Sequence, residues 1–459
     1  MRRLYALLLA ISLTIPMVVI GASKTPTIRV GIDIAPKEFT IGSVGDFAFL
    51  DGTSGKELWN GNGEVKCFFN GTTQPIYSIF IDNFYSFVDA TNFGCALLPR
   101  FTEGTSFKVF LENNFFKLEL GEFSDFSAAE EARKDILKDI PKSRVISSPG
   151  SSFKVSDGLA LRPRTDKTAY TFLKIAPKNN QMAKYRGKRY RGSISLVMSK
   201  EKLVVVNTID FEDYLKGVVP AEMPSSWHPE ALKSQAIAAR TYAIRFIDKP
   251  DTSAYDICAD TGCQVYAGFD KEIEATNKAI SDTFGQVAVF RGKPIDAVFH
   301  SSSGGYTENS EFVFSTAVSY LKGVPSTGEE ESPKNTWFKV FPFDEFNAKI
   351  KTAIKEEIGD VIDWKITKSG VSGRMFSSDV IGTKGKTTIG ASKMRNTFGL
   401  LSTWFDLVFI PDFVVICGRG WGHGVGMPQY GAKAMAQTGK KYIEILKHYY
   451  QGIEIVKWY

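Results

Sequence analysis

Residues 211–247, FEDYLKGVVPAEMPSSWHPEALKSQAIAARTYAIRFI, contain an isolated carboxylate followed by a long helical pattern. Glu222 follows the apolar residues 218–221 and lies between Pro220 and Pro224, which restrict the backbone. Apolar surroundings disfavour the ionised carboxylate and raise its pKa, so the group can stay protonated near neutral pH and act as an acid. The sequence predicts a loop that carries Glu222, either as a proton donor or as an ordinary surface carboxylate.

A helix is expected from Pro229, because proline suits the first helical position and Glu230 favours the positive end of the helix dipole. Apolar residues recur at spacings of three and four and form one stripe: Leu232, Ala236, Ala239, Ala243 and Phe246. Arg240 lies beside this stripe, two turns after Lys233. Its guanidinium could point toward the Glu222 loop or an anionic ligand, or it could belong to a solvated basic flank.

Two motifs in this stretch, YLKGVVPAEMP and EALKSQAIAARTYA, resemble the stage II sporulation protein D family and the related amidase-enhancer proteins. Members of the first family are lytic transglycosylases of peptidoglycan. The resemblance implies that Glu222 is the catalytic acid and that Arg240 is a groove residue needed for activity. In the family a strand pair precedes the catalytic segment, and residues 193–198 and 202–207 have the pattern of such a pair.

The length and composition exclude several classes of protein. A chain of 459 residues exceeds one typical hydrophobic core, so at least two domains are expected. A hydrophobic content of 43% and a charged content of 23% are ordinary for a globular protein. The net charge of +6 suits an acidic polymer such as the cell wall and is too small to indicate nucleic acid. No basic run or zinc-finger pattern favours a nucleic-acid partner.

Residues 1–23 have the pattern of an export signal. Arg2 and Arg3 precede an uncharged apolar run, residues 4–20, and small residues follow at 21–23. Cleavage is predicted, with a short membrane anchor as the alternative, because a span needs roughly 17–25 residues. No cysteine ends the run, so a lipoprotein anchor is not expected. We therefore expect an exported chain in the cell wall or periplasm, with membrane contact only through an uncleaved segment 4–20.

The chain is expected to be an α+β protein. A smaller α+β region should occupy residues 24–143, and a strand-rich catalytic domain with a long helix after the catalytic loop should occupy residues 144–459. In the first region, residues 27–34 alternate as a strand, and residues 116–120 form another strand before a helix that starts near Ser127. The second strand and its helix resemble half of a sporulation-related repeat, a glycan-binding fold. An ordinary βα unit has the same pattern.

Cys258 and Cys263 lie in the segment DICADTGCQVYAG, residues 256–268. Two cysteines at this spacing could bind one zinc ion, but zinc needs about four ligands and no histidine lies nearby. Some members of the resembled family bind zinc here, and Gly262 stands where they often carry histidine. Paired or free thiols are favoured over a metal site, since an exported chain permits disulfides. No cofactor is expected to be required.

Two polar, glycine-rich segments are expected to line a glycan groove. They are residues 300–311, HSSSGGYTENSE, and residues 418–432, GRGWGHGVGMPQYGA. Their polar side chains could hydrogen-bond sugar hydroxyls, their aromatic rings could stack on sugars, and glycine lets a ligand approach the backbone. The candidate substrate-binding residues, besides Arg240, are His300, Ser301, Ser302, Tyr306, Trp421, His423, Gln429 and Tyr430.

Both segments also resemble the family, which carries the SSSGGYTENSE pattern and GHGVGMSQ at these places. Pro428 replaces the family's serine and removes one hydroxyl and one amide donor. A plain surface turn is the alternative for the first segment. A phosphate-binding loop is the alternative for the second, but the segment lacks the Lys-Ser/Thr ending of such loops.

The single candidate carboxylate fits one kind of glycan cleavage. Glycoside hydrolysis normally uses two carboxylates, and the candidates for a second, Glu308 and Glu311, lie in polar sequence. A lytic transglycosylase needs one, because the C6 hydroxyl of the muramic acid ring attacks the anomeric carbon intramolecularly. We therefore expect Glu222 to cleave the bond between N-acetylmuramic acid and N-acetylglucosamine and to leave 1,6-anhydro ends, in wall remodelling or sporulation. The alternative is a non-catalytic glycan-binding protein that enhances a cell-wall amidase.

Overall fold

The computed structural model describes residues 25–84, 86–97, 107–112, 115–123, 126–136, 143–156, 160–161, 169–179, 181–199, 202–247 and 253–459. Strands hold 40% of the residues and helices 27%, which confirms the expected strand-rich α+β class. The predicted export signal, residues 1–23, lies outside the described residues. Among the described residues, no helix is both long and apolar enough to cross a membrane.

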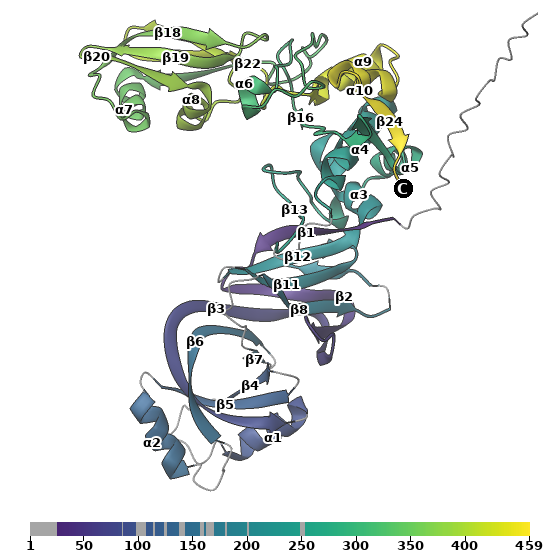
Figure 1. Ribbon diagram of the computed structural model, residues 1–459, viewed down its shortest axis with the longest axis vertical. Helices are drawn as coiled ribbons and strands as arrows, with labels where there is room; N and C mark the ends of the chain where they lie inside the picture. Colours follow the sequence, from purple (N-terminus) through teal and green to yellow (C-terminus); the bar gives the residue numbers. More distant parts are fainter. Residues whose placement is uncertain are drawn as a thin grey trace, which may run out of the picture.

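One large sheet runs through the middle and lower parts of the molecule (Figure 1). Its strands lie in the order β13-β1-β12-β11-β8-β2-β3-β5-β4, so β1 pairs with β12, the strand that leads into the Glu222 segment. The bounds at this end are β1 Thr27–Ile34, β2 Glu38–Asp51, β3 Glu57–Phe84, β8 Tyr170–Pro177, β9 Ala183–Tyr185, β10 Lys188–Tyr190, β11 Ser193–Ser199, β12 Lys202–Asp210 and β13 Ile257–Cys258. The strands predicted at 27–34, 193–198 and 202–207 are confirmed as β1, β11 and β12.

Strand β3 is long enough to belong to two parts of the molecule. Its first half pairs with β2, and its second half joins β6, β5 and β4 in the order β6-β3-β5-β4. The bounds here are α1 Phe87–Leu97, β4 Phe107–Glu112, β5 Phe115–Phe123, α2 Phe126–Ile136, β6 Ser143–Val155 and β7 Ala160–Leu161. This βαββαβ order is the split βαβ arrangement. The predicted strand at 116–120 and the helix near Ser127 are confirmed as β5 and α2, and glycan binding by this unit stays a prediction.

The expected division of the chain between residues 143 and 144 does not separate two folded bodies. It falls at the start of β6, which pairs with β3 along most of its length. β1 and β2, from the N-terminal side of the division, also pair with β12 and β8, from the other side. The N-terminal residues therefore complete the same sheet that leads into the Glu222 helix.

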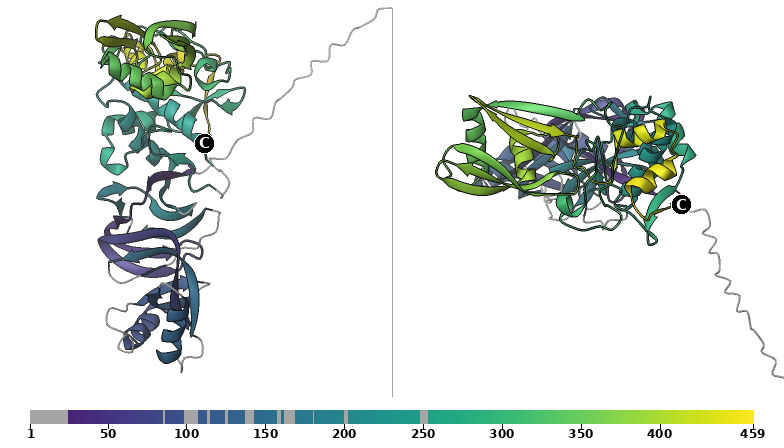
Figure 2. Two further views of the ribbon diagram at one scale, coloured as in Figure 1. Left: turned by 90° about the vertical axis from the view of Figure 1, so that its left-hand side faces the viewer. Right: turned by 90° about the horizontal axis from the view of Figure 1, so that it is seen from above.

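A helical layer packs beside the edge of this sheet and contains the Glu222 segment (Figures 1 and 2). Its elements are α3 Phe211–Glu222, α4 Pro229–Ile244, η2 Phe269–Lys271, α5 Glu274–Asp282, β14 Gln286–Phe290, β15 Lys293–Pro294, β16 Phe299–His300, α6 Glu311–Phe314, β23 Met427–Pro428, α9 Gln429–Gln437, α10 Tyr442–Tyr449 and β24 Glu454–Lys457. The predicted helix from Pro229 is confirmed as α4. Ala236, Ala239 and Ala243 pack into the core of the sheet. Leu232 and Ile237 pack into a second core with α9 and α10, so Leu232 does not share the buried face of the other residues in the predicted stripe. α4 is therefore buried on both sides.

Residues 336–419 form a small body at the opposite end of the molecule from α1 and α2 (Figure 2). Its elements are β17 Thr336–Pro342, α7 Phe343–Ala353, β18 Val361–Ser369, β19 Met375–Gly382, β20 Gly385–Gly390, α8 Ala391–Phe398, β21 Phe405–Ile410 and β22 Phe413–Arg419. Two three-stranded sheets, β17-β22-β21 and β18-β19-β20, enclose a third core around Phe346 and Phe398. This body lies in the chain between the two glycine-rich segments, and the Gly420 N–H closes it by donating to the Asn335 carbonyl oxygen over 2.9 Å.

Candidate active site

Glu222 is the last residue of α3, so it lies on a helix and not in the loop expected from the sequence. Asp210 begins this helix by accepting two backbone N–H hydrogen bonds on its side chain. Pro220 lies inside the last turn, where the missing N–H removes a helical hydrogen bond. Val218 and Val219 are fully buried in the core, and their packing holds the turn helical despite the proline.

Glu222 is half-buried, and its carboxylate has two polar partners among the residues that the structure describes. The Val265 N–H donates to Oε1 over 2.9 Å, and Nε2 of Gln429 donates to Oε2 over 3.4 Å. Burial raises the pKa of Glu222, and these two hydrogen bonds offset only part of the rise. A carboxyl group with a raised pKa is suited to donate a proton near neutral pH.

The Val265 loop follows β13, which pairs in parallel with β1. Cys258 and Cys263 form a disulfide, so the thiols are paired, one of the two arrangements that the sequence favoured over zinc. In the described part of the chain, no group of three or more His, Cys, Asp or Glu side chains is positioned to hold a metal ion. Independence from zinc stays a prediction.

The two glycine-rich segments lie against each other, as their assignment to one groove requires. β16 pairs in parallel with β23, and Ser302 and Trp421 exchange backbone hydrogen bonds of 3.1 and 2.8 Å. The Tyr430 N–H donates to the Ser301 carbonyl oxygen over 3.1 Å. α9 begins at Gln429 directly after β23, and this start brings the Gln429 amide to the catalytic candidate.

The glycines of residues 418–432 serve packing within the protein. Gly422 and Gly424 have backbone φ values of +116° and +86°, which residues other than glycine rarely adopt. A Cβ on Gly422 would lie 2.6 Å from Cβ of His300, and one on Gly424 would lie 2.3 Å from Nε of Arg374. The close approach that the sequence suggested for a sugar is, at these two positions, made by the neighbouring protein.

His300 and His423 lie with ring centroids 5.1 Å apart. The Val425 carbonyl oxygen faces Nδ1 of His300 at 3.1 Å, and because a carbonyl only accepts, this nitrogen carries the proton. The Val425 N–H donates to Nδ1 of His423, whose Nε2 faces the Phe299 carbonyl oxygen at 2.9 Å. Burial lowers the pKa of His300 well below its ordinary range and that of His423 to about 4. Both rings are therefore neutral near pH 7, so any contact of His423 with a glycan would be made by a neutral ring.

The remaining groove candidates differ in their accessibility. Ser302 is fully buried, and its hydroxyl has no hydrogen-bond partner in the described structure. Ser301, Tyr306 and Tyr430 are half-buried, and Trp421 is 45% exposed. A sugar could reach the last four side chains without rearrangement, whereas a direct contact with Ser302 would require the loop to open.

Comparison with known proteins identifies the family. A family model described as stage II sporulation protein matches residues 199–290, and one described as a domain of unknown function matches residues 314–426. The stage II sporulation protein D of Bacillus subtilis is 36% identical over 265 residues, which span 54% of this chain and 75% of that protein. The chain belongs to the stage II sporulation protein D family.

Two further members of this wider group are similar. The stage II sporulation protein D of Bacillus amyloliquefaciens is 35% identical over 267 residues, 54% of this chain and 75% of that protein. The amidase enhancer of Bacillus subtilis is 31% identical over 364 residues, 67% of this chain and 50% of that protein. The stage II sporulation protein D model covers Glu222, Arg240 and Val265.

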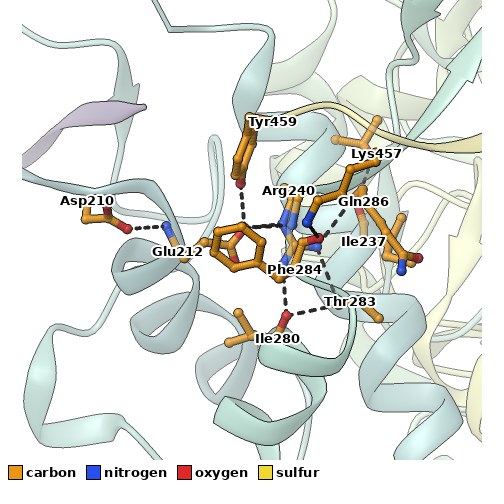
Figure 3. Close-up of polar contacts among 12 residues, drawn as sticks. Asp210, Glu212, Ile237, Arg240, Ile280, Thr283, Phe284, Gln286, Lys457 and Tyr459 are labelled. Carbon is orange, nitrogen blue, oxygen red and sulfur yellow. Dashed lines mark hydrogen bonds and ion pairs between the residues drawn. The ribbon is translucent and has the colours of Figure 1, made fainter. Parts of the chain in front are cut away.

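In this family member Arg240 is fully buried. Figure 3 shows its polar contacts with residues of the surrounding elements. Its Nε and Nη2 donate to the two carboxylate oxygens of Glu212 over 2.7 Å each, and Nη2 also donates to the Ile280 carbonyl oxygen over 3.2 Å. The Tyr459 hydroxyl donates to the same carboxylate. The substrate-binding role expected for Arg240 is therefore corrected to a structural one, because its guanidinium is already bonded inside the protein and holds α4 to α3 and α5.

Sequence reasoning missed Trp227, which follows Glu222 by five residues. Its ring meets Tyr430 edge to face, with centroids 4.7 Å apart. Nζ of Lys433 lies 5.1 Å from the Trp227 ring centroid and forms an ion pair with Glu331. This aromatic pair joins the turn after α3 to the first turn of α9. The sequence did offer one signal for this residue, a tryptophan close to a candidate acid. Because aromatic faces stack on sugar rings, such a tryptophan indicates a glycan-binding position.

Neither candidate for a second carboxylate shares a polar partner with Glu222 in the described structure. Glu308 is buried and accepts hydrogen bonds from the backbone and hydroxyl of Ser372, the latter over 2.6 Å. Glu311 forms an ion pair with Lys322 over 3.2 Å near the surface. Both carboxylates are already engaged in holding loops in place.

Proposed function

We propose that this protein is a peptidoglycan lytic transglycosylase in which Glu222 is the general acid and base. A role in the cell wall is supported by the family. The finer proposal depends mainly on the Glu222 carboxylate, whose raised pKa and two neutral hydrogen-bond donors suit one group that gives and later takes a proton. A hydrolase would need a second carboxylate nearby, and among the described residues Glu308 and Glu311 do not serve.

The two oxygens of Glu222 have different roles in this proposal. Oε1 accepts the 2.9 Å hydrogen bond from Val265 and is thereby held as an acceptor. Among the residues that the structure describes, the one polar contact of Oε2 is the long 3.4 Å contact with Gln429, so Oε2 is the oxygen available to carry the acidic proton. The Gln429 amide and the Val265 amide together fix the direction in which this proton points.

The reaction then needs no water and no cofactor. Glu222 protonates the glycosidic oxygen as the bond between that oxygen and the muramic C1 breaks. The C6 hydroxyl of the same ring bonds to C1, and its proton passes to the Glu222 carboxylate, which restores the acid. The nucleophile is part of the substrate and has a large effective concentration. The products are a 1,6-anhydro-muramyl end and a free N-acetylglucosamine 4-hydroxyl.

The Trp227–Tyr430 pair supports a glycan subsite beside this acid. Each ring presents an apolar face that could cover the CH face of a sugar, and Lys433 lies over both rings, 5.1 and 5.7 Å from their centroids. Because Tyr430 directly follows Gln429, a sugar stacked there would lie next to Glu222.

The test is the Glu222→Gln variant on purified peptidoglycan, with and without stem peptides. Glutamine keeps the shape and can still accept from Val265, but it cannot donate a carboxyl proton, so cleavage should fall by about 10²–10⁴-fold while glycan binding persists. Asp213→Asn, on the same helix, is the matched control and should cleave like the wild type. Mass spectrometry of the ends decides the mechanism: anhydro ends support it, and reducing ends, heavier by one water, would show hydrolysis instead.

A second candidate function is a non-catalytic enhancer of a cell-wall amidase. The observation that favours it is the similarity to the amidase enhancer, which extends over 67% of this chain. An amidase assay with this protein added separates the two functions. Equal stimulation by the wild type and Glu222→Gln, with no glycan cleavage by either, would favour the enhancer.

A further inference from the structure

We propose that the Cys258–Cys263 disulfide is the positioning element of Glu222, and that a dithiol reductant lowers activity by releasing the Val265 amide. The inference rests on the proposed transglycosylase function for its kinetic readout. Its structural readout, the hydrogen bond from Val265 to Glu222, does not depend on that function.

The disulfide lies close to the catalytic candidate along the chain. Cys263 precedes Val265 by two residues. The Val265 N–H makes the shorter of the two hydrogen bonds to the Glu222 carboxylate, at 2.9 Å. The Cys258 end belongs to β13, which pairs with β1, and Asp256 just before it binds Arg29 through a 2.7 Å ion pair. The sulfur–sulfur bond therefore connects the residues before Val265 to a fixed strand of the large sheet.

The tip of the loop has little else to hold it. Asp260, Thr261 and Gly262 are exposed. Hydrogen bonds at the tip are internal: the Gly262 N–H donates to the Asp260 carboxylate over 2.8 Å, and the Cys263 N–H donates to the Asp260 carbonyl oxygen over 3.1 Å. Without the disulfide, the two sides of the loop would still be linked by the Tyr266 N–H, which donates to the Ala259 carbonyl oxygen over 3.1 Å. The tip between them would be held by the internal hydrogen bonds of a turn.

The residues on either side of Val265 are anchored by their side chains. Nε2 of Gln264 donates to the Ala239 carbonyl oxygen over 3.2 Å, and the Tyr266 hydroxyl donates to Asn207 over 2.8 Å. These contacts keep the loop near α3 and α4. Two backbone hydrogen bonds hold the residues that follow Val265: the Tyr266 N–H donates to the Ala259 carbonyl oxygen over 3.1 Å, and the Ala267 N–H donates to the Gly217 carbonyl oxygen over 3.2 Å. On the other side of Val265, the disulfide two residues earlier is the covalent restraint. The rival possibility is that these hydrogen bonds suffice without the disulfide.

Reduction is chemically accessible because both cysteines are half-buried. A dithiol gives two electrons and two protons to the pair: the Cys258–Cys263 bond breaks, two cysteine thiols form, and the reductant's two thiols become a disulfide. The protein would then lose one restraint near Glu222 while its covalent chain stays intact. Reoxidation should restore the original geometry.

The test compares oxidised protein, protein treated with dithiothreitol, and the Cys258→Ser/Cys263→Ser double variant. In the last two, we expect kcat for glycan cleavage to fall at least about 10-fold with KM little changed, because misplacement of a catalytic group affects the reacting step most. Amide hydrogen exchange at Val265 should become faster. Cys95→Ser/Cys417→Ser removes two exposed thiols outside the loop, and it should respond to the reductant like the wild type.

The outcomes separate this inference from the proposed function. If oxidised protein cleaves glycan and the double variant cleaves equally well with unchanged Val265 exchange, the disulfide does not position Glu222. If oxidised protein does not cleave glycan at all, the proposed function fails, and exchange at Val265 still decides the positioning role. Recovery of kcat after reoxidation supports the inference, whereas a loss that reoxidation cannot reverse points to general unfolding and overturns it.

Discussion

Arg240 and Glu212 form a buried bidentate ion pair between α4 and the first turn of α3, with both N–O distances at 2.7 Å (Figure 3). The Glu212 carboxylate also accepts from the Tyr459 hydroxyl and the Gly285 N–H. Glu222 ends the same helix that Glu212 begins. The helix that carries the catalytic candidate is thus held by an arginine that is buried within the protein.

Removal of the arginine should destabilise the whole protein. Arg240→Met leaves the Glu212 carboxylate buried and without its cation, which typically costs about 3–5 kcal/mol of unfolding free energy. Chemical denaturation measures this loss. Lys233→Met is the control on the same helix, because Lys233 forms only longer ion pairs with Glu230 and Asp282, at 3.5 and 3.3 Å. The control should lose less than about 1 kcal/mol. Equal midpoints for Arg240→Met and the wild type would contradict the structural role.

Glu222→Gln should become more stable than the wild type as pH rises. Because the pKa of Glu222 is raised in the folded protein, the folded state binds its proton more tightly than the unfolded state. Stability of the wild type therefore falls as pH rises from the ordinary pKa of about 4.5 toward the raised value, and glutamine has no such loss. Denaturation midpoints measured in steps from pH 4 to 8, a range chosen to bracket ordinary and raised carboxyl pKa values, test this. A constant difference between the two proteins across that range would count against a raised pKa.

Gln429→Leu should shift the alkaline limb of the cleavage rate to higher pH. The Gln429 amide lowers the pKa of Glu222, so its removal from this buried position raises that pKa further. The acid must be protonated to begin the reaction, and the rate falls as pH rises through its pKa. Gln437→Leu, at the other end of α9, is the matched control and should keep the wild-type profile. If the fall in cleavage rate of Gln429→Leu occurred at lower pH than in the wild type, the assignment of Glu222 as the acid would be refuted.

His300→Gln should reduce the loss of stability in acid. Burial, the neighbouring His423 and the charge of Arg374 all lower the pKa of His300. The unfolded chain takes up a proton below about pH 6.5 that the folded ring resists, so stability is full above that pH and falls below it by about 1.4 kcal/mol per pH unit. Unfolding free energies at pH 7 and pH 5 give the slope. His448→Gln, outside the histidine pair, is the control, and an unchanged slope in His300→Gln would refute the prediction.

Local sequence patterns determined much of the framework. Alternation predicted β1, the pattern of a strand pair with a short connection predicted β11 and β12, and the proline start with its apolar stripe predicted α4. Such patterns are local, because short-range periodicity decides which faces of a strand or helix are buried. The apolar residues before Glu222 also indicated the direction of its pKa. They did not indicate that Glu222 lies on a helix, because Pro220 suggested a loop and only burial of the helix against the core overrides that preference.

The tertiary structure alone decided which distant residues meet. Gln429 reaches Glu222 from a helix that lies 207 residues further along the chain. Glu212 holds the Arg240 guanidinium inside the protein, although the helical spacing was compatible with a solvated flank. The glycines at 422 and 424 likewise pack against protein, where composition suggested a ligand. Periodicity reports which side of an element is buried, but not what it is buried against. Partners far apart in sequence are chosen by the packing of whole elements, and this packing places Arg240 inside the protein, where it supports the helix that carries Glu222.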